Sequence, residues 1–180
     1  EQLKNLVTFK DEDDFFLADD VVAQLVEMDR SGTFPDLFMG QGAYVGSGVR
    51  LSPLVRLGRQ AQVRGNVRLA TRVLIGASTQ LSTQANQNMA VGEATEILDR
   101  NILKGRITIG RKCRIETTVR MTGSDEHPMR VGDNVCIKGT TYLYGCTIDD
   151  NVLVQNCYLF NKRIRYRQDA SGRPVPVAHT

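Results

Sequence analysis

The chain has 180 residues, of which 41% are hydrophobic, 24% charged and only 6% aromatic, and its formal net charge is +3 at pH 7. No run of about 18 apolar residues occurs, and the amino end lacks a basic-then-apolar secretion signal, so the sequence predicts neither a membrane span nor export. Basic and aromatic residues are not interleaved as stacking platforms require, which argues against nucleic acid as a partner. We expect one compact domain in the cytoplasm.

The first 39 residues are predicted to form an N-terminal segment that contains one helix. Residues 18–30 carry apolar side chains close to the i, i+3, i+4, i+7 spacing of an amphipathic helix, and Gly32 and Pro35 would end it. We expect this helix to cap the exposed first coil of the repeat that follows, with docking to a partner protein as the alternative. The acidic run at residues 11–14 is interpreted as a solvated surface.

The next segment repeats every six residues. Seven aliphatic residues follow one another at this spacing: Val45, Leu51, Leu57, Val63, Leu69, Ile75 and Leu81. A second row, mostly small or β-branched, lies four positions further on: Val49, Val55, Ala61, Val67, Val73 and Thr79. A helix would repeat apolar positions about every 3.6 residues and a strand about every 2, so a period of six indicates short strands joined by recurring turns. Hexapeptide repeats of this kind predict an all-β fold, a parallel β-helix.

This repeat is expected to occupy residues 40–160. The period breaks twice, and we predict loop excursions near 82–105, before it returns at Ile109, and near 122–129. Loops that leave a rigid solenoid commonly carry its binding and catalytic residues. Residues 161–180 form a basic, proline-containing C-terminal tail.

The pattern resembles the left-handed parallel β-helix superfamily, in which three hexapeptides make one triangular coil. Within the second excursion, His127 is flanked by Asp125 and Glu126 and followed by Pro128, and then by Met-Arg-Val-Gly-Asp-Asn-Val-Cys-Ile at residues 129–137. This arrangement is similar to hexapeptide acyltransferases, in which a loop histidine precedes a Pro-x-x-Ile-Gly-Asp-Asn-Val-x-Ile coil and serves as general base. The resemblance implies a homotrimer that moves an acyl group from acyl-CoA to a hydroxyl or amine of a sugar or nucleotide-sugar.

The proposed chemistry depends on His127. Neutral imidazole titrates near neutrality, so it can accept the proton of an attacking hydroxyl or amine, and Asp125 or Glu126 can orient the ring. A merely solvated loop histidine is the alternative. Lys162, Arg163 and Arg165 are candidates to bind the phosphates of the acyl-CoA co-substrate, with a solvated basic tail as the alternative.

A second group of arginines falls on the repeat itself. Arg50 and Arg68 are 18 residues apart, which is one full coil, so we expect them to stack on one face, with Arg56 on the next. The planar guanidinium group can hold phosphates of a nucleotide or coenzyme. A solvated outer face is the alternative.

The cysteines indicate packing rather than metal binding or catalysis. The four cysteines show no paired CxxC spacing, and Cys113, Cys146 and Cys157 fit the small corner position of the repeat. A chain without an export signal is expected to keep them reduced.

Two further resemblances favour a non-catalytic β-helical scaffold or assembly subunit as the alternative function. Residues 145–154 look like the γ-class carbonic anhydrases, which bind zinc through three histidines; the corresponding positions here are Gly139, Tyr144, and Met121 or Thr122. These side chains do not supply the imidazole ligands, so we expect no bound metal. Residues 144–148 and 156–159 also resemble the β-helix domain of a sugar nucleotidyltransferase.

Overall fold

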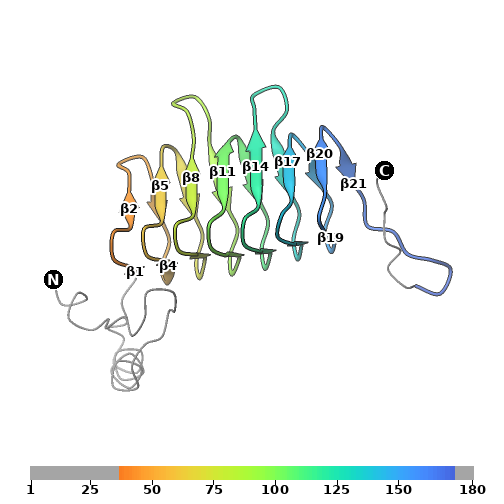
Figure 1. The fold of residues 1–180 in the computed structure, drawn as a ribbon, viewed down its shortest axis with the longest axis horizontal. Coiled ribbons are helices and arrows are strands. Elements are labelled where there is room, and N and C mark those ends of the chain that lie inside the picture. Colours follow the sequence, from red (N-terminus) through yellow and green to blue (C-terminus); the bar gives the residue numbers. More distant parts are fainter. Residues whose placement is uncertain (1–36, 173–180) are drawn as a thin grey trace, which may run out of the picture.

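The structure is a computed structural model of the chain and describes residues 37–172. Over these residues the chain winds through successive coils of three short strands each, and the strands align into three parallel seven-stranded sheets (Figure 1). We name the sheets A, B and C in the order in which each coil visits them. The capping helix predicted at residues 18–30 lies outside the described residues. No helix that could span a membrane occurs within residues 37–172.

All strands are short, and every neighbouring pair is parallel. Sheet A contains β1 (Leu37–Met39), β4 (Val55–Leu57), β7 (Leu74–Ile75), β10 (Glu96–Ile97), β13 (Arg114–Ile115), β16 (Cys136–Ile137) and β19 (Leu153–Val154). Sheet B contains β2 (Tyr44–Val45), β5 (Gln62–Arg64), β8 (Gln80–Ser82), β11 (Ile102–Gly105), β14 (Arg120–Gly123), β17 (Tyr142–Tyr144) and β20 (Tyr158–Phe160). Sheet C contains β3 (Arg50–Leu51), β6 (Val67–Leu69), β9 (Met89–Val91), β12 (Ile107–Ile109), β15 (Met129–Val131), β18 (Thr147–Ile148) and β21 (Arg163–Ile164).

The residues of the six-residue period point into the solenoid, as predicted. Five of the seven are completely buried: Leu57, Val63, Leu69, Ile75 and Leu81. Val45 and Leu51, which belong to the first described coil, are half-buried and pack against the same core. The second row is buried from Val55 to Thr79, and only Val49 of that row is half-buried. The pattern read from the sequence therefore identifies the inside of the coil.

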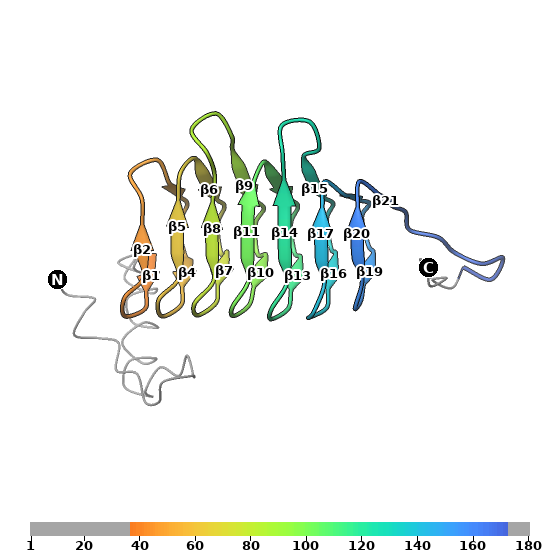
Figure 2. The same ribbon diagram turned by 45° about the horizontal axis from the view of Figure 1, so that its top comes forward.

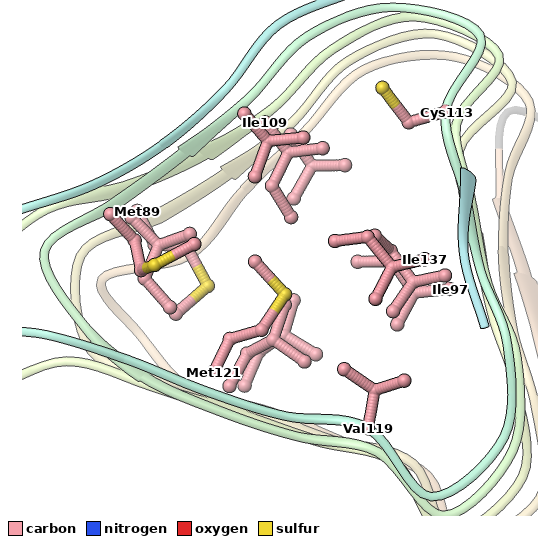
Figure 3. Packing of buried hydrophobic residues seen from close by; sticks show 14 of the residues in the cluster. Met89, Ile97, Ile109, Cys113, Val119, Met121 and Ile137 are labelled. Carbon is pink, nitrogen blue, oxygen red and sulfur yellow. The ribbon is translucent and has the colours of Figure 1, made fainter. Parts of the chain in front are cut away.

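The interior is a narrow triangular column of stacked side chains (Figure 3). Columns of aliphatic residues line the walls, with Ile97 and Ile137 in one column and Ile109 and Met121 in the others. Smaller or flexible side chains fill the corners, as Cys113 and Val119 do. Cys113 and Cys146 are buried, and burial raises the pKa of the Cys113 thiol, which agrees with their predicted role as packed small residues.

The turns between sheets A and B, which we call the A–B edge, repeat from coil to coil. In the first of these turns the residue before the inward-facing one is Gly42, with a φ of 69°. In the later turns a residue with φ between 45° and 59° takes this position; these residues are Gln60, Ser78, Arg100, Thr118, Thr140 and Asn156. A left-handed conformation costs an L residue about 1–2 kcal/mol, so other interactions must offset it. Buried Asn101 supplies some: its side-chain oxygen accepts the Val119 N–H at 2.7 Å, and its amide nitrogen donates to the Leu98 carbonyl at 2.8 Å.

The loop excursions are shorter than the sequence predicts. Strands β9, β10 and β11 lie within residues 89–105, so only residues 83–88 leave the coil at the first break, and 124–128 at the second. Leu81 and Val91 are ten residues apart, four more than the period, and this shift hides the regular continuation through Val91 and Ile97. Both loops project from the same side of the solenoid (Figure 2).

Candidate functional site

The candidate site lies where sheet B passes into sheet C, at the turns that we call the B–C edge. Loop 83–88 connects β8 to β9, and loop 124–128 connects β14 to β15. The coil between them turns from β11 to β12 through the single residue Arg106. The two loops therefore stand on either side of Arg106.

Loop 124–128 is closed by two hydrogen bonds between Ser124 and His127. The backbone N–H of His127 donates to the Ser124 hydroxyl oxygen at 2.9 Å, and the N–H of Ser124 donates to the His127 carbonyl oxygen at 3.0 Å. The serine, four residues before Pro128, thus fixes a tight turn that presents the histidine. His127 was predicted from the sequence as a site residue, whereas Ser124 was not.

The imidazole of His127 is exposed and lies against the next coil. Its ring meets the ring of Tyr144 edge to face, with 6.4 Å between the centroids and an interplanar angle of 62°. Gly145, with a φ of +60°, makes room for it, because a Cβ built on this glycine would lie 2.6 Å from the Cβ of His127. Within residues 37–172 neither ring nitrogen forms a hydrogen bond.

Asp125 ties the two loops together. Its Oδ1 lies 3.2 Å from Nη2 of Arg106, and its Oδ2 accepts a hydrogen bond from the side-chain amide of Asn86 at 3.0 Å. Arg106 also donates to the Asn86 carbonyl oxygen at 3.4 Å. The Asp125 carboxylate thus contacts loop 83–88 and the intervening coil, whereas Glu126 is exposed and has no ion pair within the described residues.

Asn86 and Arg106 were not selected from the sequence. The signal that could have found them is that the spacings from Leu81 to Val91 and from Met121 to Val131 each exceed the period by four residues. Two loops that lie two coils apart on one edge can meet across the turn between them. Their contact depends on where each side chain points, which the repeat does not specify.

An aromatic surface borders the histidine on the outer face of sheet B. It consists of Tyr142 and Tyr144 on β17 and Tyr158 and Phe160 on β20. Tyr142 and Tyr158 stack with centroids 4.7 Å apart, and Phe160 packs 4.9–5.8 Å from the other three rings. Tyr158 is 67% exposed and Phe160 43% exposed. Exposed apolar clusters of this kind mark interaction surfaces.

The residues proposed to bind acyl-CoA phosphates lie on and after the last coil. Lys162 and Arg165 are exposed, and neither has an ion pair within the described residues. Arg163, on β21, is paired with Asp149 at 3.1 Å. Lys162 follows Asn161, whose side-chain oxygen lies close to Gly145. Lys162 therefore belongs to the B–C edge, which also carries His127.

The Gly-Asp-Asn-Val segment that carries the sequence resemblance has a structural role at the opposite side, where sheet C passes into sheet A. The Oδ1 of Asp133 accepts the backbone N–H of Arg111 in the preceding coil at 2.8 Å, and this bond is the main cause of the lowered pKa of Asp133. Asn134 takes the positive φ of 55°, and Val135 is buried. The motif therefore stabilises the turn of the coil and takes no part in the site of His127.

Two of the positions that correspond to zinc-binding histidines carry side chains that pack against neighbouring residues. Met121 is buried in the core, and Tyr144 belongs to the aromatic surface. Across residues 37–172, no group of three or more His, Cys, Asp or Glu residues is placed to hold a metal ion.

Three of the solved structures to which the chain is similar are described as acyltransferases. A variant of perosamine N-acetyltransferase from Caulobacter crescentus, solved with CoA and GDP-perosamine, is 20% identical over 76% of this chain and 61% of its own, with a TM-score of 0.34. LpxA from Acinetobacter baumannii is 14% identical over 73% and 64%, with a TM-score of 0.39. UDP-N-acetylglucosamine acyltransferase from Arabidopsis is 13% identical over 72% and 65%, with a TM-score of 0.30.

This chain spans less than two thirds of the length of each of these structures. No family model matches the sequence. The assignment as a hexapeptide-repeat β-solenoid rests on the period of the chain and on its three parallel sheets.

Proposed function

We propose that the chain is a left-handed hexapeptide-repeat acyltransferase that moves an acyl group from acyl-CoA to a hydroxyl or amine of a sugar or nucleotide-sugar, with His127 as general base. The observation that carries the proposal is the exposed imidazole on a loop fixed by Ser124 and, through Asp125, by Arg106 and Asn86. A general base must be held in place and accessible. The resemblance of the His127 loop and coil to those of hexapeptide acyltransferases supplies the reaction class.

In the proposed reaction, Nε2 or Nδ1 of His127 takes the proton from the acceptor hydroxyl or amine as that atom attacks the thioester carbonyl. A C–O or C–N bond forms and the C–S bond breaks. The imidazolium then returns its proton to the departing CoA thiolate. Neither a metal nor a covalent enzyme intermediate is required.

Asp125 and Glu126 are proposed to orient the histidine in different ways. The Asp125 carboxylate contacts Arg106 and Asn86, which supports a role in holding the loop. Glu126 is free to approach the ring once a substrate is bound. For the donor phosphates, exposed Lys162 and Arg165 are better placed to bind than Arg163, which is paired with Asp149.

We further propose that the protein assembles, as a homotrimer or with another β-helix subunit, through the aromatic surface of Tyr142, Tyr144, Tyr158 and Phe160. Because His127 touches Tyr144 at the rim of this surface, a subunit docked there would form one wall of a cleft around the imidazole. The same exposed surface favours the alternative function, a non-catalytic scaffold or assembly subunit. We propose the cytoplasm as the location in either case.

The test is an acyl-transfer assay that offers acetyl-CoA together with a panel of sugar and nucleotide-sugar acceptors to the full chain. His127→Ala should leave the fold intact and lower the rate by about 10²–10⁴-fold, the usual contribution of a general base. His179→Ala, which removes the only other histidine, is the matched control and should keep the full rate.

Equal rates in the wild type and in His127→Ala would contradict the proposed role. If no acceptor consumes the thioester and the coenzyme does not bind, the scaffold function is favoured instead. Sedimentation of the wild type and of Tyr158→Ser/Phe160→Ser then tests assembly separately, because the double substitution should dissociate any oligomer that forms through the aromatic surface.

A further inference from the structure

The charges of the chain are divided very unevenly along the sequence. Residues 37–92 contain no acidic residue and carry six basic residues, all of them arginine: Arg50, Arg56, Arg59, Arg64, Arg68 and Arg72. Residues 1–36, which come directly before, contain ten acidic residues and only three basic ones. The small net charge of the whole chain conceals this contrast.

The six arginines are not neutralised within the described part of the chain. All five of its ion pairs are formed between residues at or after position 96, in the later coils. Arg64 lies over the ring of Tyr44 at 4.9 Å, and Arg50, Arg56, Arg68 and Arg72 are exposed without any such contact. Uncompensated like charges on neighbouring coils repel one another, so this surface is suited to bind an anion.

Four of these arginines lie on or beside the turns from sheet C to sheet A in two neighbouring coils. Arg50 and Arg68 are direct neighbours on β3 and β6, as their spacing predicts. Arg72 lies in the turn that follows β6, where its N–H donates to the Pro53 carbonyl oxygen at 3.3 Å. Pro53 belongs to the corresponding turn of the preceding coil, which leads from β3 to β4, and Arg56 lies on β4. We call these four residues the C–A arginine surface.

The acidic segment joins the solenoid at this surface. In β1, Leu37 pairs with Val55 and Phe38 with Arg56, so the chain enters sheet A beside Arg56, next to the turn that contains Pro53. The acidic run at residues 11–14 is separated from Leu37 by enough chain to extend about 75 Å, whereas neighbouring strands are only about 4.8 Å apart. Every acidic residue of the segment can therefore reach the arginines.

We infer that the C–A arginine surface is the docking surface of the acidic N-terminal segment, residues 1–36, of the same chain. The opposite charges attract, and the covalent connection raises the effective concentration of the segment to the millimolar range, so a weak contact suffices. Docking would neutralise the arginines and cover them against external polyanions. Because the attraction is electrostatic and the arginines are exposed, it must weaken with salt: the Debye length falls from about 10 Å at 0.1 M to about 3 Å at 1 M.

The test uses the absence of tryptophan from the chain. Phe15→Trp in the full chain places a single fluorophore directly after the acidic run, and its time-resolved anisotropy separates a docked segment, which tumbles with the protein over nanoseconds, from a free one. In this background, Arg50→Gln/Arg68→Gln should raise the amplitude of the sub-nanosecond component about two-fold, because free chain segments reorient on that timescale. Raising NaCl from about 0.02 M to about 1 M should likewise increase the sub-nanosecond component in the Phe15→Trp protein that keeps all its arginines.

The matched control is Arg120→Gln/Arg130→Gln, which removes the same charge from exposed positions without ion pairs in the later coils. It should leave the anisotropy unchanged. Docking is refuted if the Arg50/Arg68 variant behaves like the parent, or if the control pair changes the anisotropy equally. A third measurement adds inorganic polyphosphate, which should compete with the segment for the arginines and increase the sub-nanosecond component of the anisotropy. If polyphosphate binds without changing the anisotropy, the arginine surface binds an external polyanion and the inference is overturned.

Discussion

Two edges of the same solenoid behave differently. At the A–B edge every coil turns in the same way, with a positive-φ residue followed by an inward-facing one, and buried Asn101 and Thr79 bond the turns of neighbouring coils. At the B–C edge the coils differ, since one turns through Arg106 alone and two carry loops. The repeat therefore specifies the structure where side chains face inward, and it leaves the sequence free where the chain departs from the ladder of strands.

The largest effect is expected for a charge placed inside the coil. Leu69→Asp should abolish soluble folding, because Leu69 is completely buried and an unpaired carboxylate in a narrow apolar core costs several kcal/mol. Arg68→Asp, on the neighbouring outward position of the same strand, is the matched control and should fold. Soluble yield and circular dichroism measure the difference, and a folded Leu69→Asp would disprove the inward register.

Two asparagines compare the edges directly. Asn101→Leu leaves the buried N–H of Val119 without its acceptor and should lower the free energy of unfolding by about 1–3 kcal/mol. Asn86→Leu, in the exposed loop 83–88, should change it by much less. Urea unfolding of both variants provides the measurement. Equal losses would mean that the B–C edge contributes as much stability as the A–B edge.

The smallest effect on stability is expected where the two loops meet. Asp125→Ala removes the ion pair with Arg106, in which both side chains are more than 40% exposed, so the free energy of unfolding should fall by about 0–1 kcal/mol. Acyl transfer should fall by less than in His127→Ala, because Asp125 is proposed to hold the loop and not to take the proton. A larger loss in Asp125→Ala would identify a carboxylate as the proton acceptor.

The sequence alone determined the repeat, the inward rows and the stacking of Arg50 on Arg68, because the six-residue period is written into each short segment and needs no distant contact to be recognised. It also selected the loop that carries His127. It misjudged the first excursion, since a four-residue insertion shifts the period and makes the regular strands β9 to β11 resemble a loop.

Which residues from different coils come together depends on the folded arrangement of the coils. Asn86, Arg106 and Asp125 lie in three successive coils and meet because the inserted loops rise from one edge, and Tyr142 stacks on Tyr158 because β17 pairs with β20 in that register. Such contacts depend on the lengths of the turns between strands and on the rotamer of each exposed side chain. A local period constrains neither, because exposed side chains and loop atoms contribute nothing to the core that enforces it.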